Sequence, residues 1–189
     1  TSTNTIVKRL THADLVRPAN GKFHPTRKRF YAGGVGKITV WDTTDLANPV
    51  YLRTLIPLAG STGEYRGVVV YKGSTTTIDG YVYFSNLVDA KVYIYRAADI
   101  EGPNPVPVKV FDSTHGFVRP HYFAVRPHSS EVWMGNRPAH ANGTLVRFNG
   151  DTRELITAPT TTLETTSLPG DEPNEIGFSK DGALAYVGH

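Results

Sequence analysis

Histidines are the first candidates for chemistry in this chain of 189 residues, which contains no cysteine. Imidazole is the commonest metal ligand and exchanges protons near neutral pH. Five of the seven histidines lie in the C-terminal half: His115, His121, His128, His140 and His189. No HxH or HExxH spacing directs two of them onto one ion. The absence of cysteine excludes disulfides, zinc–thiolate sites and thiol nucleophiles.

Four stretches of the sequence align with one another and set the positions of the histidines, arginines and acids. They are RPANGKFHPTRKRFYAGG from Arg17, EYRGVVVYKGSTTTIDGYVYFSN from Glu64, RPHYFAVRPHSSEVWMGN from Arg119 and EPNEIGFSKDGALAYVGH from Glu172. Each contains a strand, a polar turn and a second strand that ends in two small or polar residues. A third strand, a polar connection and a fourth strand follow the first three stretches. Repeats of about 50 residues in this order are typical of propeller blades.

The repeats predict an all-β fold, a β-propeller that forms one partial domain over residues 1–189. They cover approximately residues 12–60, 61–115, 116–168 and 169–189, and the last is incomplete. This corresponds to about three and a half four-stranded blades of a seven-bladed ring. The remainder of the propeller, or a second chain, is expected to complete the ring. The open edge of the strand at 183–189 is expected to cause self-association. The competing fold is a small irregular β-sandwich.

Individual strands are predicted from β-branched and aromatic residues that are bounded by turn residues. The expected strands include residues 37–41, 50–56, 81–84, 91–95 and 106–111. Tyr81 alternates with Tyr83, and Tyr93 alternates with Tyr95. Alternate residues of a strand point to the same face, so we expect each pair to pack between neighbouring blades.

The inner strands of a propeller line its central channel, so the residues at their entrances should meet at one mouth. Two equivalent positions define each aligned entrance: Arg17 and Ala19, Glu64 and Arg66, Arg119 and His121, and Glu172 and Asn174. Arg17, Arg66 and Arg119 are suited to an anionic cofactor or ligand. His121, with help from His115, Asn174 and Glu172, is the candidate set for a metal with nitrogen and oxygen ligands. In the alternative, these groups only satisfy one another across a water-filled channel.

The fourth stretch contains a further pattern, in which Pro-Asn precedes an apolar strand, Ser-x-Asp-Gly and Tyr-Val: PNEIGFSKDGALAYVGH. It resembles the inner-strand signature of a bacterial propeller superfamily. That superfamily holds YVTN-repeat surface proteins, the cytochrome d1 domain of nitrite reductase, the nitrous oxide reductase propeller and calcium-dependent lactonases. The third stretch is a variant of the signature, and ITVWDTTDLANPVYLRTL resembles the outer part of such blades. The resemblance implies a scaffold, and this scaffold hosts unrelated functions.

Two alternative sites are implied by the resemblance. In the lactonases, an Asn of this pattern binds calcium together with an early glutamate and a later aspartate. Asn174 matches that Asn, Glu64 would be the early acid, and the later acid would lie beyond His189. In nitrous oxide reductases, histidines surround the channel mouth. His121 has the matching Pro-His position, but the paired His-His of that copper site is absent from this sequence.

Composition limits the partners and the compartment. The net charge is only +3 at pH 7, so we expect no nucleic-acid partner. No apolar run approaches the roughly 20 residues of a membrane-spanning helix, so we expect no membrane span. Complete absence of cysteine favours a periplasmic or secreted protein, in which stray thiols are a hazard.

Three functions follow from these features. The first is an extracytoplasmic propeller that binds a metal ion, copper or iron, or a redox cofactor at its channel mouth as part of a periplasmic redox protein. The second is a calcium-dependent, lactonase-like hydrolase. The third is a non-catalytic scaffold whose rims bind protein partners. These alternatives leave open whether the chain is an enzyme.

Overall fold

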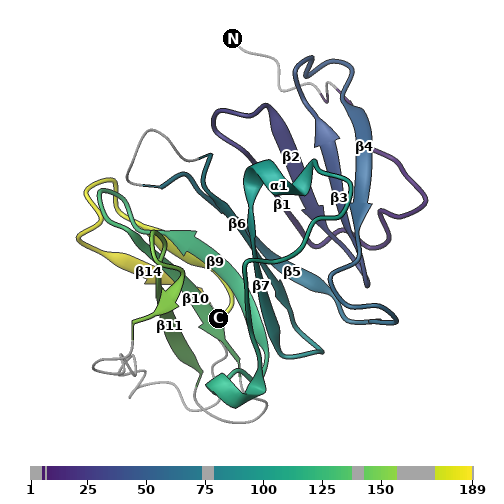
Figure 1. The fold of residues 1–189 in the computed structure, drawn as a ribbon. Helices are drawn as coiled ribbons and strands as arrows, with labels where there is room; N and C mark the ends of the chain where they lie inside the picture. Colours follow the sequence, from purple (N-terminus) through teal and green to yellow (C-terminus); the bar gives the residue numbers. More distant parts are fainter. Residues whose placement is uncertain (1–5, 7, 74–78, 138–142, 157–172, 189) are drawn as a thin grey trace.

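In the described part of the chain, three four-stranded antiparallel sheets and one two-stranded sheet make up the fold (Figure 1). The computed structural model describes residues 6, 8–73, 79–137, 143–156 and 173–188. The first sheet contains β1 (Asn20–Phe23), β2 (Arg29–Gly33), β3 (Ile38–Asp42) and β4 (Val50–Leu55). The second contains β5 (Tyr65–Tyr71), β6 (Tyr81–Asn86), β7 (Lys91–Arg96) and β8 (Lys109–Phe111). The third contains β9 (Pro120–Val125), β10 (Glu131–Asn136), β11 (Thr144–Asn149) and β12 (Glu154–Leu155).

The fourth sheet pairs β13 (Ile176–Phe178) with β14 (Ala185–Val187). Within the described ranges, β14 has no strand on its outer edge. Helix is confined there to α1 (Ala97–Ile100) and a single 3-10 turn, η1 (Ser113–His115). None of the helices in the described part of the chain is long and apolar enough to span a membrane.

The strands of each sheet follow their order in the chain, and the first strand of each sheet lies nearest to the neighbouring sheets. β1 contacts β5, β5 contacts β9, and β9 contacts β13. A cavity of about 330 Å³ is lined by residues of all four of these strands. The four sheets therefore succeed one another around one axis, with β1, β5, β9 and β13 innermost. This arrangement is a partial β-propeller, and it confirms the predicted fold class.

The hydrophobic core is divided between two interfaces of neighbouring sheets. The first and second sheets enclose one cluster, which includes Tyr31, Val40, Val82, Phe84, Tyr93 and Tyr95. The second and third sheets enclose the other, which includes Tyr81, Tyr83, Ile94, Phe123, Val132, Met134 and Phe148. Tyr81 and Tyr83 thus share one interface, and Tyr93 and Tyr95 share the other, as their alternation predicts.

In the first three sheets, small residues lie at or next to the end of the second strand because the next inner strand passes against them. A Cβ atom on Gly33 would collide with the backbone oxygen of Tyr65 at the start of β5. A Cβ atom on Gly135 would lie 2.7 Å from the backbone oxygen of Pro173. In the second sheet the hydroxyl of Ser85 fills this place and donates a 2.5 Å hydrogen bond to the backbone oxygen of His121. The repeated small residue is therefore a contact between sheets.

Strand ends differ from the prediction by one to three residues. The strand expected at 106–111 begins only at Lys109, because Pro107 lacks the N–H group that pairing with a neighbouring strand requires. The strand expected at 50–56 ends at Leu55. The last strand is β14 rather than residues 183–189, since Gly182, with φ of +71°, belongs to the preceding turn.

Candidate functional site

The entrances of the four inner strands meet at one mouth, as the repeat alignment predicts. Arg17, before β1, pairs with Glu64, before β5, at 2.7 Å. The hydroxyl of Tyr122 in β9 lies 3.4 Å from the backbone oxygen of Ala19, 103 positions earlier in the chain. His121 lies 3.3 Å from the backbone oxygen of Asn174, before β13. Polar contacts therefore connect the first sheet with the second and third, and the third with the fourth.

His121 is the buried centre of this mouth. Its side chain has no exposed surface. Arg137 Nη1 lies 3.2 Å from Nε2 of His121, and a guanidinium can only donate, so Nε2 is the acceptor. Nδ1 then carries the proton and donates to the backbone oxygen of Asn174. Both ring nitrogens are engaged in hydrogen bonds.

The surroundings of His121 keep its imidazole neutral. Burial, followed by the positive charges of Arg137, Arg66 and Arg119, lowers the pKa of His121 to about 4, although the hydrogen bond to Asn174 opposes the shift. The three guanidinium groups come from different places in the fold: the start of β5, the residue before β9 and the residue after β10. The imidazole is therefore a neutral group in a positive environment at neutral pH.

Among the described ion pairs, Glu64 supplies the carboxylate at this mouth. Its Oε2 atom lies 2.6 Å from Nε of Arg66, and its Oε1 atom lies 2.7 Å from Nη2 of Arg17, so two guanidinium groups share one carboxylate. The side chain of Arg17 is largely exposed, whereas that of Glu64 is only 14% exposed. The buried Oδ1 atom of Asn174 has no hydrogen-bond partner among the described residues.

Two of the predicted metal ligands are not brought to His121 by described contacts. His115 ends η1, where its Nδ1 lies 3.1 Å from Asp112 and its ring packs edge-on against Phe111. Those contacts are local to the outer strand of the second sheet. Glu172 lies outside the described residues, as do His140 and His189. No group of three or more His, Cys, Asp or Glu side chains in the described ranges is placed to hold a metal.

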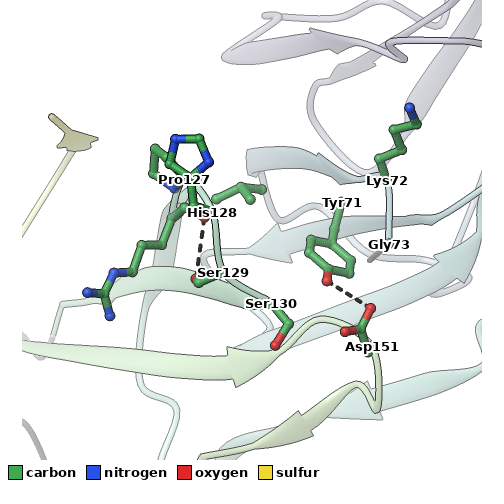
Figure 2. Close-up of a pocket in the computed structure, with 10 residues that line it drawn as sticks. Tyr71, Lys72, Gly73, Pro127, His128, Ser129, Ser130 and Asp151 are labelled. Atoms are coloured by element: carbon green, nitrogen blue, oxygen red, sulfur yellow. Dashed lines mark hydrogen bonds between the residues drawn. The ribbon is translucent and has the colours of Figure 1, made fainter. Parts of the chain in front are cut away.

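A second candidate site lies at the opposite ends of the inner strands, where a cavity of about 470 Å³ opens between the second and third sheets (Figure 2). Tyr71 at the end of β5 donates a 2.8 Å hydrogen bond to Asp151. Burial, and then this hydrogen bond, raises the pKa of Tyr71. The β9–β10 hairpin closes the other side, with the Ser129 hydroxyl 3.4 Å from the backbone oxygen of Arg126. His128 is exposed at the tip of this hairpin.

Sequence reasoning missed two residues of these sites. Arg137 follows Asn136 directly, so it lies one position beyond the aligned stretch that contains His121. Asp151 directly follows the Asn149-Gly150 pair, which by itself predicts only a tight turn. A search for charged residues next to each turn, rather than only at strand entrances, would have included both.

The comparisons with known proteins support the fold and do not extend to a family. No protein-family model matches this chain, and no curated protein matches it. Among solved structures, a chain of the "Crystal Structure of Mitotic Checkpoint Complex" aligns with a TM-score of 0.62 and 13% identity, over 90% of this chain. This chain spans 47% of the length of the matched chain. The molecule is thus a propeller-like protein, and at this identity the likeness concerns the fold alone.

Proposed function

We propose that this chain is a binding module whose channel mouth holds an anionic group, a carboxylate or a phosphate. The observation that carries the proposal is the gathering of arginines around His121. The charges of Arg66, Arg119 and Arg137 all act on this one buried imidazole. Arg17 reaches the same mouth through its ion pair with Glu64.

Charge favours an anion over a cation at this mouth. Arg17 and Arg66 share the carboxylate of Glu64, so these three residues together carry one excess positive charge. His121 is neutral at pH 7 and adds no negative charge. Planar guanidinium groups match the paired oxygens of carboxylates and phosphates, and they bind most strongly where water is partly excluded.

The state of His121 supports binding rather than proton transfer. General acids and bases work best with a pKa close to the operating pH. A pKa of about 4 keeps the ring of His121 neutral at pH 7, so it holds no imidazolium proton to release, and both ring nitrogens already have partners. We therefore assign His121 the task of positioning Arg137.

A metal or redox cofactor at His121, with Asn174 and Glu172, is the second proposal. The buried Oδ1 atom of Asn174, which has no partner among the described residues, supports it, because amide oxygens suit hard cations such as calcium. The surrounding guanidinium groups oppose a cation. Copper or iron, a lactonase-like reaction and a periplasmic redox role are supported by the sequence resemblance alone.

Calorimetric titration of the purified chain with inorganic phosphate and with citrate tests the anion proposal. We expect saturable binding that weakens with added salt. Arg66→Gln should weaken it about tenfold or more, since a lost charge-assisted hydrogen bond costs about 1.5–3 kcal/mol. Arg96→Gln is the matched control, because Arg96 is an exposed arginine at the far end of β7. Absence of binding by the wild type, or equal losses in both variants, would contradict the proposal.

Metal analysis of the same preparation separates the second proposal from the first. Copper or iron near one equivalent, lost in His121→Gln, would favour a metal centre. Calcium that is retained through dialysis and lost in Asn174→Leu would favour the calcium site. Both results would count against an anion site at this mouth.

A further inference from the structure

The cavity of about 470 Å³ between the second and third sheets lies at the other end of the inner strands from the channel mouth. Its polar lining comes from three connections: Tyr71 and Lys72 at the end of β5, Ser129 and Ser130 in the β9–β10 hairpin, and Asp151 after β11. Figure 2 shows the two serines on one side and the hydrogen-bonded pair of Tyr71 and Asp151 on the other. Small-molecule sites have volumes of about 300–1,000 Å³, so this cavity is large enough for a small ligand.

The pair of Tyr71 and Asp151 is held in place by its neighbours. The Oδ1 atom of Asn149 accepts the backbone N–H groups of Asp151 and Thr152, each at 3.0 Å, and this turn fixes the position of Asp151. A Cβ atom on Gly150 would lie 2.6 Å from the ring of Tyr71, so the turn passes closely over that ring. Tyr71 donates its one proton to Asp151 and can still accept a hydrogen bond. A carboxylate has about four lone-pair sites, so Asp151 can accept further donors.

The serine side of the cavity is also fixed. The backbone oxygen of Ser130 accepts the N–H group of Gly150 at 2.6 Å, which joins the β9–β10 hairpin to the turn that carries Asp151. The Ser129 hydroxyl accepts the backbone N–H group of Glu131 at 3.1 Å. A serine hydroxyl both donates and accepts. The two sides therefore present a carboxylate, a phenol oxygen and two hydroxyl groups at positions set by the backbone.

Charge around this cavity differs from charge at the channel mouth. Lys72 and Asp151 carry opposite charges, and Arg126 Nη1 lies 3.3 Å from the carboxylate of Glu131. These two positive and two negative groups cancel, whereas guanidinium groups are in excess around His121. Lys72 points away from Asp151 (Figure 2). A neutral polar ligand is favoured here, because an ion would give up its hydration without an uncompensated charge to replace it.

We propose that this cavity binds a neutral sugar. A sugar ring carries adjacent hydroxyl groups, each of which donates and accepts. Two of them would donate to the carboxylate of Asp151, and others would pair with Tyr71, Ser129 and Ser130. Val125 and Pro127 add apolar lining, against which the C–H groups of the ring would pack. None of these residues belongs to the proposed anion site, so the two proposals stand or fall separately.

Amide NMR of the isotopically labelled chain, titrated with D-glucose, D-galactose, D-mannose and N-acetyl-D-glucosamine, tests this proposal. We expect at least one of these sugars to shift the amide signals of Ser129, Ser130 and Asp151 saturably. Asp151→Asn keeps an acceptor for Tyr71 but removes the charge, so affinity should fall about tenfold or more. Asp45→Asn is the matched control, because Asp45 is an exposed acid in the β3–β4 turn and does not line this cavity.

Ser130→Ala is a second variant, in which the backbone acceptor for Gly150 is kept and only the hydroxyl is lost. It should weaken the same sugar severalfold without changing thermal unfolding. No shift at the three amides with any of the four sugars, up to about 100 mM, would overturn the proposal. Equal weakening in Asp151→Asn and Asp45→Asn would also overturn it. So would stronger shifts of the same amides by inorganic phosphate or by ethylammonium chloride, which would identify an ion site.

Discussion

Tyr83 and Tyr186 are the same residue at the same position in two sheets, but one is fully buried and the other is 61% exposed. The second sheet is followed by the third, which places Phe123 against Tyr83. The described part of the chain places no sheet against Tyr186. Because each sheet of a repeat fold contacts only its neighbours, stability is expected to follow interfaces rather than residue types. Four predictions test this difference between an internal interface and an end face.

The largest effect is expected from Tyr83→Ala. The substitution leaves a cavity in the cluster between the second and third sheets, where burial of a large aromatic side chain is typically worth about 3–5 kcal/mol. The free energy of unfolding, measured with urea, should fall by that amount. A loss below about 1 kcal/mol would mean that this interface is not the source of stability.

Acidification should have the next largest effect, through His121. Burial first, and then the neighbouring guanidinium groups, lower its folded-state pKa to about 4. The pKa of a histidine in an unfolded chain is about 6.5. The unfolded state therefore binds the proton first, so stability is lost as the pH falls from about 6.5 to about 4. The full loss is about 3 kcal/mol. His24, whose pKa is also lowered by burial, acts in the same direction.

Urea denaturation at several pH values measures this loss. His121→Gln should flatten the dependence of unfolding free energy on pH between these limits. His128→Gln is the control, because His128 is exposed at a hairpin tip. An equally steep dependence in His121→Gln and the wild type would show that His121 is not the group responsible.

A smaller effect is expected from Gly67→Ala, which adds a single methyl group. The new Cβ would collide with the backbone oxygen of His121, which belongs to the neighbouring sheet. Overpacking of this kind costs about 1–3 kcal/mol. Gly177→Ala in β13 is the control at the end face, because nothing lies within 4 Å of its Cβ position. Equal thermal shifts in the two variants would contradict the assignment of Gly67 to an internal contact.

The smallest effect is expected from Tyr186→Ala in the monomer. An exposed side chain contributes little to folding, so the free energy of unfolding should change by less than about 0.5 kcal/mol. The measurement is urea unfolding at low protein concentration. A loss as large as that of Tyr83→Ala would show that Tyr186 is buried in the folded monomer.

Much of the fold was predictable from sequence because its signals are periodic. Tyr81 and Tyr83 share a face since strand side chains alternate with a period of two, whatever the strand packs against. The repeat also predicted that Arg17, Glu64, Arg66, His121 and Asn174 meet at one mouth. Equivalent positions of successive sheets become neighbours when the sheets surround one axis.

The sequence by itself determined the strand order, the positions of the small strand-end residues and the convergence of the entrances. Only the tertiary structure decided that Arg137 donates to His121 and that Tyr71 donates to Asp151, because a hydrogen bond depends on a distance that no spacing along the chain encodes. It also decided that Tyr83 is buried and Tyr186 is not. Periodicity reports the face on which a side chain lies, whereas burial requires another sheet against that face.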